Sequence, residues 1–230
     1  MTALLEQDLR AMSFEDVRRH SRQLADDLSK LAFNREGFSE SEYMTLDGPY
    51  LVELIQGKLQ VLPMPSAFHQ SILGFVYLML RMWASKHTGV RVMTAPFRIR
   101  LGADHYREPD IAVMLARNAD RCSQQQWIGA DFVVEIVSDS NRAHDTTTKR
   151  VEYAKAGIGE YWIIDPTTDP TTDSAGANPF LSVTLTQLLL VEGEYVEAAR
   201  LVDSGMVHGK VLDGFSMDVS QMLADAKSNS

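Results

Sequence analysis

The chain has 230 residues, 45% of them hydrophobic, so it can bury a core large enough for one domain with extensions. Its 22 basic and 31 acidic residues give a net charge of −9, which argues against a protein that grips nucleic acid through a basic surface alone. The single cysteine, Cys122, excludes an internal disulfide and favours a reducing cytoplasm.

The apolar segments are too short to cross a membrane. The longest candidate, SILGFVYLMLRMWASK, is interrupted by Arg81 and is more typical of a buried helix. The N-terminus lacks a charged segment followed by an apolar one, so we expect no secretory signal. These patterns predict a cytoplasmic protein without membrane contact.

The two ends of the chain differ from its middle. Residues 1–32 have helical spacing and many charges, which indicates either an accessory arm for homodimer contacts or a poorly ordered terminus. Residues 34–49 are rich in turn formers and are typical of a linker. We therefore expect a helical arm and linker at 1–40, a main domain at 41–220 and a flexible tail at 221–230.

Strand and helix patterns alternate through the main domain. Residues 50–62 predict a β-hairpin, and residues 69–86 repeat apolar side chains at the spacing of a core-facing helix. Further segments predict strands at 90–101, 109–115, 131–138, 160–165, 180–190 and 194–199, and helices at 145–156 and 219–226. The biased run at 166–179 predicts a surface loop. This alternation favours an α/β fold with a mixed central sheet flanked by helices.

Glu135 stands inside the apolar strand predicted at 131–138. Because strand side chains alternate, Glu135 shares one face with Val133 and Val137. An ionised carboxylate in such a setting costs several kcal/mol or more unless a cation or strong hydrogen bonds compensate. Buried carboxylates are rare and usually paired, so we interpret Glu135 as a functional residue with a partner elsewhere.

The helix predicted at 145–156 offers that partner. Asp145, Lys149 and Tyr153 follow one another at i, i+4 and i+8, which places them on one stripe. A strand followed by a helix that folds back on the sheet can bring Lys149 toward Glu135. A carboxylate, an ammonium and a phenol would then surround one cleft.

Each remaining candidate also has an ordinary structural explanation. Asp110 follows a proline at the head of a strand and can simply begin it, while Glu53 can lie on a solvated strand face. Asp145 can cap its helix, and Lys149 can be a surface lysine. His69 is more often structural at a helix start, although it would lie near Glu53 if the hairpin packs on that helix.

The order of motifs is similar to that of the Uma-type family of endonucleases, a branch of the PD-(D/E)XK nuclease superfamily. The motifs are VELIQGKL, a helix that opens with His69, EPDIAV, DFVVEIVSDSN and DTTTKRVEYAKAGIGEYWIIDP. The resemblance covers about residues 43–220. It implies a restriction-endonuclease-like core, a divalent metal such as magnesium or manganese, and DNA as the substrate.

The resemblance also implies roles for individual residues. Asp110 matches the aspartate of the PD motif and Glu135 the acidic residue of (D/E)XK, while Val137 stands where lysine is expected. Lys149 would supply the amine from the next helix instead. Glu53 would complete the catalytic set and assist Asp110 and Glu135 as a metal ligand. The positions that would contact these groups or the substrate are His69, Asp145 and Tyr153.

Physical chemistry supports a metal independently of the resemblance. Clustered carboxylates without a cation repel one another, and a bound cation would let an acidic cleft accept phosphate. Lys149 would be charged beside Glu135 and Asp110, which favours an electrostatic role over that of a base. Two alternatives remain open: a non-enzymatic module of the same fold that binds nucleic acid or protein, and a metal-dependent hydrolase of small phosphate compounds.

Overall fold

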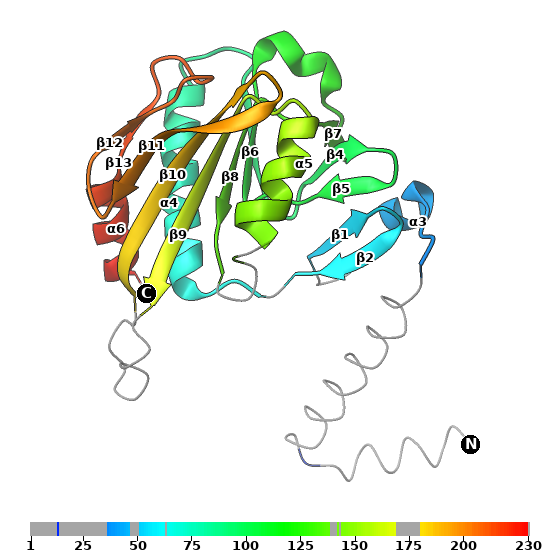
Figure 1. Ribbon diagram of the computed structural model, residues 1–230, viewed down its shortest axis with the longest axis horizontal. Coiled ribbons are helices and arrows are strands. Elements are labelled where there is room, and N and C mark those ends of the chain that lie inside the picture. The colour runs from blue at the N-terminus through cyan, green and yellow to red at the C-terminus, as the bar shows by residue number, and fades with distance from the viewer. Residues whose placement is uncertain are drawn as a thin grey trace.

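The computed structural model describes Ser13 and residues 36–46, 51–62, 64–138, 142, 144–168 and 180–229. The arm expected at 1–32 and most of the loop expected at 166–179 lie outside the described residues. The described part contains two mixed β-sheets with helices packed on them (Figure 1). This architecture confirms the predicted α/β fold class.

A six-stranded sheet forms the larger layer, with β8 between β9 and β6 near its centre. The strands β8 and β9 run parallel, and every other neighbouring pair in this sheet is antiparallel. In spatial order the strands are β11 (Glu194–Val202), β10 (Phe180–Val191), β9 (Glu160–Thr168), β8 (Phe132–Ile136), β6 (Ile111–Met114) and β3 (Arg91–Thr94).

A five-stranded sheet lies beside it and includes the predicted hairpin. The hairpin strands pair in register around a turn at Gln56 and Gly57, both of which have positive φ angles. Glycine adopts that backbone region without strain, as such a tight turn requires. In spatial order the strands are β2 (Lys58–Val61), β1 (Val52–Ile55), β5 (His105–Arg107), β4 (Arg98–Gly102) and β7 (Gln126–Ile128).

Four α-helices and several short elements complete the described part. The α-helices are α3 (Glu40–Met44), α4 (Ala67–Ala84), α5 (Lys149–Lys155) and α6 (Val219–Ser228). The short elements are the 3-10 helix Ala116–Arg121, the π-helical turn His144–Thr148, and the two-stranded ladder of β12 (Met206–His208) and β13 (Ser216–Asp218). Among the described residues, no helix is both long and apolar enough to cross a membrane.

The two faces of β8 enter two separate cores. Phe132 and Ile136 pack in a cluster with residues of α4 and α6, whereas Val133 and Val137 pack in a cluster that includes residues of α5. Figure 1 shows α5 on the near side of the six-stranded sheet and α4 behind it. Since side chains alternate along a strand, Glu135 belongs to the α5 side.

Helix α4 is the core helix that the apolar repeat predicts. Ser66 caps its N-terminus by accepting a hydrogen bond from the backbone N–H of His69 at 3.1 Å. Ile72, Val76 and Leu80 lie on its buried face against the sheet. This cap sets where the helix begins and therefore where His69 lies.

The segment before α5 differs from the single helix predicted at 145–156. The chain first forms a π-helical turn at His144–Thr148, and α5 begins at Lys149. Gly157 has a φ of 74°, a left-handed conformation that ends the helix as predicted. Lys149 therefore lies in the first turn of a short helix and is buried.

The single strand predicted at 90–101 is wrong, because the structure divides it into β3 and β4. Pro96 lies between them, and proline has no backbone N–H to donate to a sheet ladder. The strand β3 joins the six-stranded sheet and β4 the five-stranded sheet. The chain returns between the sheets from β5 to β6, through Glu108 and Asp110.

The predicted linker at 34–49 contains a helix. Ser39 and Glu42 form a capping box at the start of α3, which orders this polar segment. Tyr43 is fully buried, and its hydroxyl donates to the carbonyl of Val52 at 2.7 Å. The segment therefore packs against β1.

The C-terminal residues form α6 as far as Ser228, which confirms the helix predicted at 219–226 and extends it into the tail expected at 221–230. Met222, Leu223 and Ala226 are buried in the cluster that also contains α4. Asp218 caps this helix through the backbone N–H of Ser220. The segment contains many polar residues, and burial of this apolar face keeps it helical.

Candidate active site

Lys149 and Glu135 form a buried ion pair between α5 and the central strand β8. The Nζ of Lys149 lies 2.8 Å from Oε2 of Glu135, and each side chain is 4% exposed. The alternation along β8 directs Glu135 toward α5, and the first turn of α5 places Lys149 above it. The structure thus brings together the two residues that the sequence analysis paired.

Tyr153 holds the other oxygen of the same carboxylate. Its hydroxyl donates to Oε1 of Glu135 at 2.5 Å. Burial raises the pKa of Tyr153 well above its ordinary value, and the charge of Glu135 raises it further, so the phenol stays protonated as a donor. Because Lys149 and Tyr153 are four residues apart on α5, one face of this helix binds both oxygens of Glu135.

Asp110 lies beside Glu135 across the β6–β8 ladder. Ile111 pairs with Val134 in that antiparallel ladder, and the backbone N–H of Ile136 donates to Oδ2 of Asp110 at 2.7 Å. The side chain of Asp110 is 17% exposed, whereas that of Glu135 is 4% exposed. Asp110 therefore lies just before β6, opposite Glu135 in the neighbouring strand, and it is the more solvent-exposed of the two carboxylates.

His69 contacts Asp110. Its Nε2 lies 3.2 Å from Oδ2 of Asp110, because the N-terminus of α4 packs near the start of β6. The sequence analysis expected His69 near Glu53, provided that the hairpin packs on α4. Instead, Glu53 lies in the five-stranded sheet, next to β5 and α5.

Glu53 is fully buried in β1 and has cations on two sides. Its Oε2 lies 2.6 Å from Nη1 of Arg107, and its Oε1 lies 4.0 Å from Nζ of Lys149. Burial alone would raise the pKa of Glu53, but the charges of Lys149 and Arg107 outweigh it and the pKa is lowered. Lys149 therefore lies between two ionised carboxylates, one on each sheet.

Four residues of this region escaped the sequence analysis. Arg107 binds both Glu53 and Glu152, and His105 lies 3.4 Å from Glu152. Glu108 is buried beside Tyr43 and Arg98, and its Oε2 has no hydrogen-bond partner among the described residues. The run HYREP, a cluster of charged residues directly ahead of a buried strand, could have indicated three of them, but Glu152 lies in α5 outside that run. The residues missed are His105, Arg107, Glu108 and Glu152.

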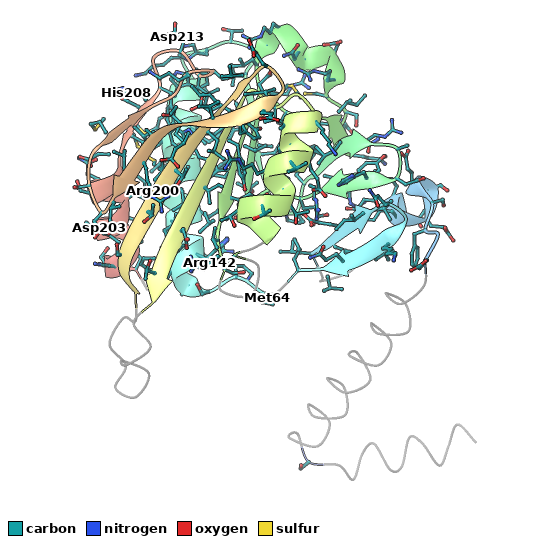
Figure 2. The ribbon with its side chains drawn as sticks, viewed as in Figure 1. Met64, Arg142, Arg200, Asp203, His208 and Asp213 are labelled. Atoms are coloured by element: carbon teal, nitrogen blue, oxygen red, sulfur yellow. The ribbon has the colours of Figure 1, made fainter. Side chains whose placement is uncertain are left out.

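Arg142 is a partly exposed cation that lies just before the π-helical turn. Its guanidinium pairs with Asp165 and donates to the carbonyl of Pro166 at 3.4 Å, at the far part of β9. In Figure 2 it lies toward the same end of the molecule as Met64, which precedes α4, and away from Arg200 and His208. The side chain is 41% exposed, and the carboxylate of Asp165 balances its positive charge.

Two residues of the site have side chains that suit a hard divalent cation. Asp110 and Glu135 supply carboxylate oxygens, the ligands that Mg²⁺ and Mn²⁺ prefer. Among the described residues, no group of three or more His, Cys, Asp or Glu side chains is arranged to hold a metal ion. Both oxygens of Glu53 already bind Arg107 and the N–H of Glu108, just as both oxygens of Glu135 bind Lys149 and Tyr153. Asp145 lies in the π-helical turn, and its side chain is outside the described residues.

Comparisons with known proteins agree with this fold. A family model described as "Uma2: Putative restriction endonuclease" matches residues 40–220. No curated protein matches the chain. A solved structure from Anabaena variabilis, described as "a putative nuclease", is similar with a TM-score of 0.62 and 18% sequence identity, over 82% of this chain and 99% of that chain. At that identity the likeness shows a common fold.

Proposed function

The chain belongs to the Uma2 restriction-endonuclease family, and from that premise we propose that it is a metal-dependent endonuclease that hydrolyses phosphodiester bonds in DNA. The observation that carries the proposal is the buried pair of Lys149 and Glu135 beside the half-buried Asp110. An amine and two carboxylates at one place are the groups that phosphodiester hydrolysis requires. Buried, paired ionisable residues of this kind are concentrated at functional sites.

Asp110 and Glu135 would hold the divalent ion. When bound, Mg²⁺ or Mn²⁺ would neutralise charge on the phosphoryl oxygens and make a bound water more acidic. His69 would keep Asp110 in place through its Nε2, and Tyr153 would do the same for Glu135 through its hydroxyl. Both carboxylates would thus meet the ion in orientations that the protein has already set.

Lys149 would act as an ammonium group. Two carboxylates flank its Nζ, at 2.8 Å and 4.0 Å, and they stabilise the charged form. In this form it would orient the attacking water or stabilise negative charge on the phosphoryl oxygens as the bond breaks. Glu53 would assist by holding Lys149 in that form. Asp145, which precedes α5, would contact these groups or the substrate.

The remaining expectations complete the proposal. Residues 41–220 would form the nuclease-like domain, and α6 would extend it because its apolar face packs with α4. The protein would work in the cytoplasm as a homodimer whose arm at 1–40 contributes contacts.

One observation favours a second function. Lys149 and Tyr153 bind both oxygens of Glu135, and the described residues hold no cluster of three metal-binding side chains. A nuclease fold that has lost catalysis could keep this pair for stability and bind nucleic acid or protein instead. Metal binding separates the two functions, because only the enzyme needs an ion at Glu135.

The decisive experiment combines calorimetry with DNA cleavage. Wild-type protein should bind Mn²⁺ and cleave plasmid DNA, whereas D110N and E135Q should lose both properties. K149M should bind Mn²⁺ but not cleave. The matched control is D104N, because Asp104 is exposed at a φ of 48°, a conformation that asparagine tolerates. Mn²⁺ binding that E135Q leaves unchanged, with no cleavage of plasmid or mononucleotide substrates, would favour the binding module.

A further inference from the structure

Arg107 is a fully buried arginine that joins three elements near the candidate site. It ends β5, and its Nη1 lies 2.6 Å from Oε2 of Glu53 in β1. Its Nε and Nη2 each donate at 2.8 Å to the carboxylate of Glu152 in α5. A planar guanidinium can bridge two carboxylates at fixed angles, which an ammonium cannot. Arg107 therefore ties the strand that carries Glu53 to the helix that begins at Lys149.

Among the described residues, two carboxylates lie within 4.0 Å of Nζ of Lys149, and one of them is much closer than the other. Its Nζ lies 2.8 Å from Glu135 and 4.0 Å from Glu53. Both oxygens of Glu53 are bound, Oε2 by Arg107 and Oε1 by the backbone N–H of Glu108 at 3.0 Å. In a buried setting an unsatisfied carboxylate attracts any cation nearby. The guanidinium weakens that attraction, so the amine stays closer to Glu135.

We propose that Arg107 is a positioning residue for Lys149, which keeps the amine on Glu135 by satisfying Glu53 and anchoring Glu152. The inference rests on the proposed function, in which Lys149 acts on the scissile phosphate. Without the guanidinium, Glu53 would be a buried carboxylate without its closest cation, and Lys149 is already 4.0 Å away. The amine would move toward Glu53 and leave its place beside Glu135.

The test uses variants of the full chain that separate capture by Glu53 from loss of packing. R107M removes the guanidinium, and R107M/E53Q also removes the carboxylate that would capture the amine. R107K keeps the positive charge but can bind only one of the two carboxylates. It provides the same test if R107M fails to fold. The matched control is R100M, because Arg100 on β4 binds Glu40 at 2.6 Å and has no contact with Glu53 or Glu152 among the described residues.

Cleavage kinetics give the first readout. R107M should lower kcat roughly 100-fold with KM little changed, because displacement of a reacting group by about 1 Å has an effect of that order. R107K should fall between R107M and wild type, and R107M/E53Q should regain about tenfold over R107M. R100M should match wild type. If R107M/E53Q is no more active than R107M, or if R107K has wild-type kcat, Arg107 has a structural role alone and the inference is overturned.

Crystal structures of the variants give a second readout that does not depend on activity. In R107M or R107K, Nζ of Lys149 should move from Glu135 to within hydrogen-bond distance of Glu53, and in R107M/E53Q it should remain on Glu135. This readout stands even if wild-type protein cleaves no DNA, a result that would overturn the proposed function but not the positioning role. An amine that stays on Glu135 in R107M and R107K overturns the positioning role, whatever the activity.

Discussion

The Nζ of Lys149 lies 2.8 Å from Oε2 of Glu135, although the lysine begins a helix and the glutamate lies inside a central strand. Both side chains are 4% exposed, so neither charge is solvated. In such a pair the mutual attraction offsets a large cost of desolvation, and loss of one partner leaves the other charge buried and uncompensated. Stability is therefore more sensitive to removal of one member than to removal of both.

We expect K149M to lower the free energy of unfolding by about 3–5 kcal/mol, the cost of breaking a buried pair from one side. The double variant K149M/E135Q should be more stable than K149M, because it leaves no uncompensated carboxylate. Urea unfolding at pH 7 with a chelator, followed by circular dichroism, measures both values. A K149M protein as stable as wild type would show that Glu135 is satisfied without the lysine.

Removal of the Tyr153 hydroxyl tests the second hydrogen bond to Glu135. The Y153F variant should lose about 1.5–3 kcal/mol of stability, because in the wild-type protein the Tyr153 hydroxyl donates to a charged acceptor at 2.5 Å. The matched control is Y195F, whose hydroxyl donates to the neutral carbonyl of Ile158 at 2.7 Å and should cost about 0.5–1.5 kcal/mol. Equal losses in the two variants would show that the carboxylate does not strengthen the bond to Tyr153.

Glu108 should make stability depend on pH. Burial raises the pKa of Glu108 from its ordinary value of 4.5 to about 7; Arg98 opposes the rise and Glu53 adds to it. Between these values the folded protein holds a proton that the unfolded chain has released. Stability should therefore fall as the pH rises from about 5 to about 7, by about 3 kcal/mol in all from this group.

The E108Q variant should remove that dependence. It should be more stable than wild type at pH 8, and the difference should shrink as the pH falls to 5, because the folded wild-type protein then holds Glu108 in a neutral form, as the glutamine side chain is at every pH. Unfolding curves from pH 5 to 8 in metal-free buffer measure the difference. If it stays constant over this range, Glu108 does not titrate there.

Helix α4 offers a test of how His69 is held. S66A removes the side chain that accepts from the N–H of His69 at 3.1 Å, and it should cost about 0.5–2 kcal/mol. The control is S71A, because the Ser71 hydroxyl donates to the carbonyl of Ala67 inside the same helix and such bonds add little to helix stability. Thermal unfolding of both variants gives the comparison, and equal melting temperatures would show that Ser66 does not contribute as a cap.

Some features of the site can be predicted from single elements of the sequence. The alternation along residues 131–138 places Glu135 on one face, and the spacing of Lys149 and Tyr153 places both on one stripe of a helix. The cost of a carboxylate in an apolar strand then demands partners for Glu135. Each of these steps needs only the period of one element and the chemistry of one side chain.

Other features depend on how distant elements pair. The apolar run at 90–101 does not reveal that β3 and β4 join different sheets, and the polar segment at 34–49 does not reveal a helix held by the burial of Tyr43. Arg107 looks like any charged residue in a short strand until β1 and α5 bring two carboxylates to it.

The sequence by itself determined the family, through its motifs and their order. It also indicated the α/β class and the pairing of Lys149 with Glu135, because adjacent elements and their periodicity define those two features. Only the tertiary structure decided that His69 contacts Asp110 and that Arg107 binds Glu53. These contacts join residues that are far apart in the chain. Their charges interact only after the order of strands in both sheets has been set, and that order depends on burial summed over the whole molecule.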